Sequence, residues 1–259
     1  MLKQTLLVAG VLSIATAASA LELTNPFYGP AKNTIASTTT YDFETETVKT
    51  NGMRLKSYEH YVAETLRYGL TDTVSLDARV SNTFDKDVLP LTHTDRTDKN
   101  IDFEVGSTWN VLTGPAKLQV QGAYGQAESN NFDNLGAYKY VLGGIKAGYT
   151  MGIYTPYVSG TAELPVAQNK NADNHYKYEG KAGVYAYCPR MKTAVDTGVR
   201  VNYDETVEAR TFAYDLEVSY FITKNWAVSA FGSVTFDGKA EDSTDVYGNK
   251  VGLKLRTAF

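Results

Sequence analysis

The sequence predicts an all-β chain that folds as an antiparallel up-and-down β-barrel of about twelve strands. Three observations support this prediction: apolar and polar residues alternate along the chain, the alternating segments are long, and tight turns alternate with longer connections. The composition agrees, because 19 Tyr and 21 Gly among 259 residues favour strands over helices. All-β barrels of this length routinely form one domain, so we expect a single one.

The first twenty residues predict a secretory signal peptide. Lys3 supplies a positive start, residues 6-15 form a short apolar segment, and residues 18-20 are a small-residue cleavage site. The apolar segment is too short to anchor the chain in a bilayer. We therefore expect residues 1-20 to be removed and the product to be exported, although a buried N-terminal helix is the alternative.

Strand boundaries are expected where Gly, Pro, Asn or Asp interrupt the alternation. Most of the strands hold roughly 11 to 15 residues, which exceeds the usual length in soluble sheets and suffices to cross a bilayer at a tilt. The predicted strands are 33-47, 56-69, 74-85, 100-111, 116-127, 137-149, 154-164, 175-187, 193-204, 209-221, 226-237 and 246-259.

The alternation is clearest in the last strand, where one face is apolar and the other carries cations. This pattern alone does not distinguish a soluble sandwich from a barrel in lipid, because the apolar face could be the core of either. The apolar face holds Val251, Leu253, Leu255, Thr257 and Phe259, and the other holds Lys250, Gly252, Lys254, Arg256 and Ala258.

The lengths of the connections distinguish these two architectures. Every second connection is tight, and most of the others, such as 86-99 and 165-174, are longer and rich in Asp, Asn and Lys. Short periplasmic turns, longer outer loops and an even number of strands are typical of outer-membrane barrels. The tight turns are 69-73, 112-115, 150-153, 188-191 and 222-225.

With these features, residues 33-259 resemble a bacterial outer-membrane β-barrel protein of a small porin-like family. Phe259, with apolar residues at alternate positions before it, resembles the C-terminal signal read by the barrel-assembly machinery, although Thr257 departs from the bulkier apolar residue that is more usual there. The resemblance implies a Gram-negative outer membrane, surrounding membrane lipid, and the assembly machinery as a partner during biogenesis.

Residues 21-32 precede the first strand and contain Pro26 and Pro30. They fit a periplasmic N-terminal segment, which we prefer, or a partial plug of the lumen.

Charged residues of both signs are expected on the inward faces. They allow a narrow, water-filled passage, with a basic sector near the last strand and acidic sectors at strands four and ten, or an ion-paired filling. At the seam, Lys250, Lys254 and Arg256 are expected opposite Asp42 and Glu44. The predicted lumen-lining residues are Asp42, Glu44, Asp77, Arg79, Asp102, Glu104, Lys117, Lys146, Glu163, Lys181, Asp196, Arg200, Asp215, Glu217, Lys250, Lys254 and Arg256.

Strand 56-69 conflicts with this scheme, because placing Leu66 and Tyr68 outward also places Glu64 outward near the middle of the membrane. We expect a β-bulge or a shifted register to resolve the conflict.

The net charge of -4 disfavours a nucleic-acid partner. The sequence predicts a narrow passive channel for small polar or charged solutes. The first alternative is a non-conducting structural or surface-interaction barrel.

The second alternative is an endopeptidase, because Asp85, Asp87, Asp173 and His175 resemble the rim of the omptin proteases. This resemblance implies that Asp173 orients His175 as the base and that the other two aspartates hold the water. Omptins have ten longer strands, and the match covers only these short motifs.

We expect no cofactor or metal. The single Cys188 offers no thiolate cluster, and His93, Asp95 and Asp98 fit a solvated loop better than a metal site.

Overall fold

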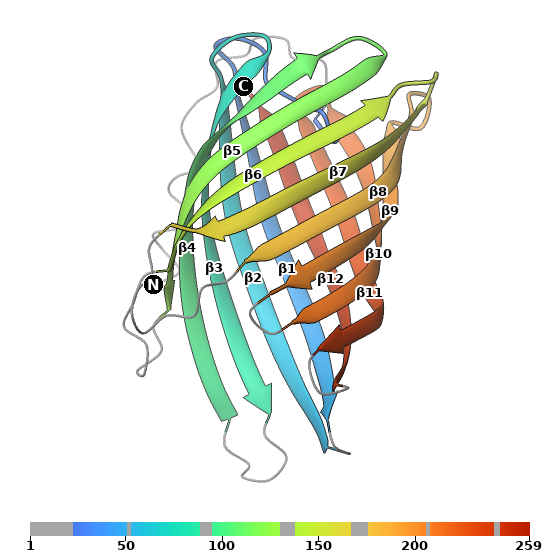
Figure 1. The fold of residues 1–259 in the computed structure, drawn as a ribbon. Coiled ribbons are helices and arrows are strands. Elements are labelled where there is room, and N and C mark those ends of the chain that lie inside the picture. The colour runs from blue at the N-terminus through green and yellow to red at the C-terminus, as the bar shows by residue number, and fades with distance from the viewer. Residues whose placement is uncertain are drawn as a thin grey trace.

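The computed structural model describes residues 23-50, 53-88, 95-129, 138-166, 176-205, 208-240 and 244-259. In these ranges twelve antiparallel strands form a closed barrel, which confirms the predicted fold class (Figure 1). Each strand pairs with its neighbours in sequence, and β1 closes the barrel against β12. The strands are β1 (Ile35–Thr50), β2 (Met53–Gly69), β3 (Val74–Val88), β4 (Asp95–Leu112), β5 (Ala116–Ser129), β6 (Tyr138–Tyr149), β7 (Tyr154–Pro165), β8 (Lys177–Cys188), β9 (Thr193–Asp204), β10 (Ala209–Thr223), β11 (Trp226–Ala240) and β12 (Thr244–Ala258).

No helix in the described ranges is long and apolar enough to cross a bilayer.

Several strands, β3 and β4 among them, extend further at the long-loop end than the sequence predicted. Residues 86-99 were expected to form one long connection, but β3 continues to Val88 and β4 begins at Asp95. Charged residues occupy consecutive positions here, so no alternation marks the strand. The short turns and the C-terminus lie together at the other end of the barrel (Figure 1), which we call the short-turn end.

The apolar stripe of each strand faces away from the enclosed interior. In β12, Val251 and Leu253 are 59% and 62% exposed, whereas the side chains of the alternating Lys250 and Lys254 are only 29% and 25% exposed. The alternation therefore separates an outer apolar wall from an inner polar one.

The segment before β1 lies inside the barrel at the short-turn end. Residues 23-28 contact inward side chains of the wall, as a partial plug would, whereas Ala31 and Lys32 are exposed. Leu23, Phe27 and Tyr28 are buried together with inward residues of the wall. Small side chains on four strands leave room for them: Ala36, Ala194, Ala227 and Ala258.

The conflict at β2 is resolved differently from the prediction. Neither pairing of β2 has a register shift, and Glu64 lies on the same outward face as Val62 and Leu66. Its carboxylate instead accepts hydrogen bonds from the hydroxyls of Ser37 and Thr39 on β1, the latter at 2.5 Å. Local hydroxyl donors, rather than a bulge, accommodate this outward carboxylate.

Phe259 completes the closure of the barrel. Its backbone N–H donates to the Ile35 carbonyl at 2.8 Å, and its carbonyl accepts from the Ile35 N–H at 3.0 Å. Its ring packs edge-on against Trp226, with the ring centroids 6.4 Å apart. The role of Phe259 as an assembly signal stays a prediction.

Candidate functional site

Two cavities lie inside the barrel. The first, of about 410 Å³, borders the N-terminal segment, and we call it the plug-side cavity. The second, of about 660 Å³, borders the middle of the lumen, and we call it the central cavity. Both are lined by Arg67, Lys181, Glu217 and Lys254, so the two cavities adjoin along the barrel.

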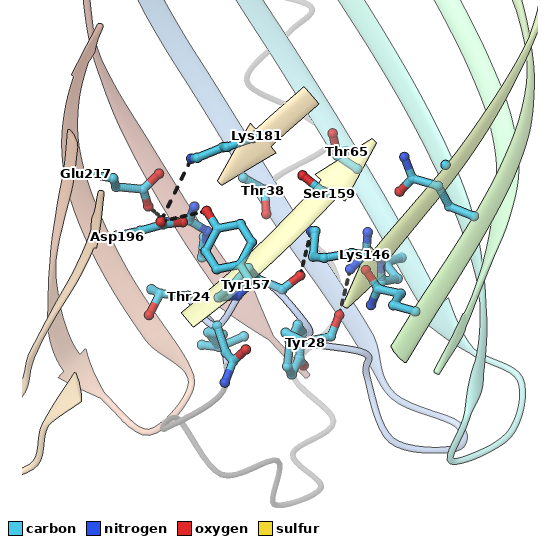
Figure 2. A pocket seen from close by; sticks show the side chains of 18 of the residues that line it. Thr24, Tyr28, Thr38, Thr65, Lys146, Tyr157, Ser159, Lys181, Asp196 and Glu217 are labelled. Atoms are coloured by element: carbon cyan, nitrogen blue, oxygen red, sulfur yellow. Dashed lines mark hydrogen bonds and ion pairs between the residues drawn. The ribbon is translucent and has the colours of Figure 1, made fainter. Parts of the chain in front are cut away.

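Two cations of the wall hold the backbone of the N-terminal segment. Lys146 Nζ on β6 donates to the Pro26 carbonyl at 2.8 Å, and the Arg67 guanidinium on β2 donates to the Tyr28 carbonyl at 2.9 Å (Figure 2). Such charge-assisted hydrogen bonds are stronger than neutral ones. The wall thus tethers a segment that has no strand of its own.

Two aromatic side chains of the wall hold the same segment from the side. Phe27 packs edge-on against Tyr157 of β7, with centroids 6.2 Å apart. The hydroxyl of Thr24 lies 3.0 Å from that of Tyr185 on β8, in a buried hydrogen bond. Packing and polar contacts together place residues 23-28 across the short-turn end of the lumen.

The basic last strand and the acidic tenth strand neutralise each other. Glu217 on β10 lies 2.6 Å from Lys254 Nζ and 2.7 Å from an Arg256 guanidinium nitrogen. At the seam only Lys250 reaches Asp42 and Glu44, at 3.8 and 2.7 Å. The expected seam pairs of Lys254 and Arg256 are therefore wrong.

The register explains this difference. Across the seam Lys254 and Arg256 lie opposite Thr40 and Thr38, which carry no charge. On the other side Ser229 of β11 lies opposite Lys254 and is too short to block it, so both cations reach over β11 to the next strand. The separate basic and acidic sectors expected at strands twelve and ten are thus one ion-paired cluster.

A second cluster joins β8, β9 and β10. Arg200 binds Asp215 at 3.1 Å and approaches Glu179 at 3.6 Å. Lys181 lies 3.8 Å from Asp196 and 3.7 Å from Asp215. This cluster gives the wall of the central cavity charges of both signs.

A third cluster lies on the opposite wall. Arg67 donates to Asp77 at 2.6 Å, and the Thr108 hydroxyl donates to the same carboxylate at 2.5 Å. Arg79 hydrogen-bonds to the Tyr61 hydroxyl and lies opposite Glu104 in the β3–β4 register.

The predicted lumen-lining residues are placed as follows. Glu44, Asp102, Lys117 and Glu163 do not line either cavity. Those that do are Asp42, Asp77, Arg79, Glu104, Lys146, Lys181, Asp196, Arg200, Asp215, Glu217, Lys250, Lys254 and Arg256.

Sequence reasoning missed the uncharged part of the lining. Gln119 and Gln121 share the face of Lys117 on β5, and Ser159 and Thr161 share the face of Glu163 on β7. Their spacing of two residues from Lys117 and Glu163 indicates the same inward face, although these side chains carry no charge.

The protease hypothesis stays an untested prediction, because the structure describes only part of its four residues. Asp85 and Asp87 belong to β3, where their backbones pair with Asp98 and Arg96 of β4. Asp173 and His175 lie outside the described residues, as does His93 of the metal hypothesis. Among the residues that are described, no group of three or more His, Cys, Asp or Glu is arranged to hold a metal ion.

Comparisons with known proteins support the fold. No family model and no curated protein matches the sequence. An outer-membrane channel from Pseudomonas putida F1 is similar in structure, with a TM-score of 0.71 and 12% identity over 91% of this chain and 98% of that chain. The translocator domain of the autotransporter NalP from Neisseria meningitidis has a TM-score of 0.54 and 10% identity over 90% of each chain.

A third similar structure is a FadL homologue from Pseudomonas aeruginosa, with a TM-score of 0.51 and 10% identity over 92% of this chain and 96% of that chain. At these identities the likeness shows the fold alone. This chain therefore has the fold of bacterial outer-membrane β-barrels.

Proposed function

We propose that this protein is a narrow passive channel of the bacterial outer membrane for small polar or charged solutes. The observation that carries the proposal is the pair of adjoining cavities, whose shared wall is polar and bears both charge signs. An ion-paired wall offers hydrogen bonds to a solute without a strong net field against either sign.

The N-terminal segment sets the narrow point of the proposed path. It lies between the plug-side cavity and the short-turn end, and its carbonyls bond to Lys146 and Arg67. A solute that leaves the plug-side cavity must pass this segment or displace it. We therefore expect a small conductance that depends on residues 23-28.

Planar bilayers test the proposal. Refolded protein starting at residue 21 is expected to give small, discrete current steps in potassium chloride. A variant that lacks residues 21-32 tests whether the N-terminal segment restricts the path. It is expected to give larger current steps than the protein starting at residue 21. If neither protein gave current steps although gel mobility showed that both were folded, the non-conducting structural barrel would be favoured.

A further inference from the structure

Five cationic side chains line the plug-side cavity, and four of them face a carboxylate. Lys146 differs, because within the described part of the chain no carboxylate oxygen lies within 4.0 Å of its Nζ. The paired cations, with partners at 2.6 to 3.8 Å, are Arg67 with Asp77, Lys181 with Asp196 and Asp215, and Lys254 and Arg256 with Glu217.

The ammonium group of Lys146 has donors to spare. It donates one hydrogen bond, to the Pro26 carbonyl at 2.8 Å, and its Nζ lies 5.9 Å from the centre of the Phe27 ring. An ammonium has three N–H donors, so two remain for other acceptors. A partly buried cation without a carboxylate is costly, and an anion brought to it would recover that cost.

Uncharged polar side chains surround Lys146. Gln119 and Ser159 lie directly opposite it on β5 and β7. Gly144 leaves the space that Gln121 occupies, since a Cβ there would lie 2.7 Å from the Gln121 amide nitrogen. Figure 2 shows several of these groups around the one cavity. Those that make no side-chain hydrogen bond with a described residue are Thr38, Thr65, Gln121, Ser159 and Thr161.

From this arrangement we infer that the plug-side cavity binds a small oxyanion, a carboxylate or a phosphate, at Lys146. The ammonium supplies the charge, and the amide of Gln121 and the hydroxyls of Ser159 and Thr161 supply further donors to the oxygens. The acidic groups of the cavity oppose an anion little, because Glu179, Asp196 and Glu217 are themselves ion-paired. Only the role of this site in permeation rests on the proposed channel. In that channel, the site would make small oxyanions the class of solute that passes.

Calorimetry with inorganic phosphate tests the site independently of conduction. Refolded protein in detergent micelles is expected to bind phosphate saturably, and Lys146→Gln is expected to weaken the affinity about tenfold, the effect of losing one charge-assisted hydrogen bond. Lys117→Gln is the matched control, because Lys117 also donates to a backbone carbonyl, that of Thr113 at 2.9 Å, but lies outside both cavities. Its affinity is expected to equal that of the wild type.

A second variant separates binding from the position of the plug. The double substitution Ser159→Ala, Thr161→Val removes two hydroxyls without touching the bond to Pro26. It is expected to weaken phosphate binding about threefold while the hydrogen bond from Lys146 to the Pro26 carbonyl is kept. Absence of saturable binding in the wild type, or equal affinity in Lys146→Gln, would overturn the site. Binding that depends on Lys146 in a protein silent in bilayers would refute the channel and leave the oxyanion site standing.

Discussion

At the scale of single residues, a glutamate side chain has opposite effects on stability on the outer and the inner face of the wall. Glu64 points outward from β2 and is accommodated by two hydroxyls, whereas Glu217 points inward from β10 and binds two cations. In a membrane, an outward carboxylate is disfavoured by lipid, but an inward one is stabilised by its ion pairs.

Glu64→Leu is therefore expected to stabilise the barrel. Removing a carboxylate from the lipid side should raise the free energy of unfolding, because a charge facing lipid is destabilising. The expected change is only about 1 kcal/mol, because Asp and Glu on this face destabilise a barrel less than Lys and Arg do. Unfolding by urea in lipid vesicles, followed by tryptophan fluorescence, measures this change. A lower stability of the variant would show that the Glu64 carboxylate contributes more than it costs.

The same substitution at Glu217 is expected to have the opposite effect. Glu217→Leu leaves Lys254 and Arg256 without this partner, and the free energy of unfolding should fall by about 2 kcal/mol. The measurement is the same urea titration. If both Glu→Leu variants changed stability equally, the assignment of the two faces would be wrong.

At the scale of the strands, glycines on the wall make room for large neighbours. Tyr140 of β6 lies opposite Gly125 of β5, and a Cβ at Gly125 would lie 2.1 Å from the tyrosine ring. The ring is buried, and its hydroxyl lies 3.4 Å from a Glu104 oxygen. The glycine thus allows an aromatic side chain to cover the adjacent strand.

Gly125→Val is expected to destabilise the barrel by about 2 kcal/mol, since overpacking forces Tyr140 from its position. Gly143→Val in β6 is the matched control, because a Cβ there meets nothing within 4 Å. Urea unfolding of both variants in vesicles measures the difference. Equal stabilities would contradict the packing described for Tyr140.

At the scale of the whole molecule, closure leaves an apolar outer wall around an ion-paired lumen. We propose that lipid contacts that wall, and the signal peptide predicted at residues 1-20 would deliver the chain to the outer membrane. The processed protein is then expected to start at Leu21 and to stay in the membrane fraction through salt and carbonate washes. Mass spectrometry and fractionation measure both properties. Release of the protein without detergent would contradict the membrane placement.

Although a bulge or shifted register was wrongly expected at Glu64, the alternation of residues together with the lengths of the connections determined the all-β class, the twelve strands and the outward or inward face of most positions. This was possible because the period of two is a local property of an extended chain in contact with two media. Residues 86-88 and 95-99 were wrongly assigned to a connection because charged residues at consecutive positions hide that period.

Only the tertiary structure decided which charges meet and where the N-terminal segment lies. Lys254 and Arg256 pair with Glu217 because the register of three strands sets their heights in the barrel. Phe27 enters the lumen because Gly148, remote in sequence on β6, leaves space for it, since a Cβ there would lie 2.8 Å from the ring. Both outcomes depend on how the sheet closes, and the period of any single strand carries no information about closure.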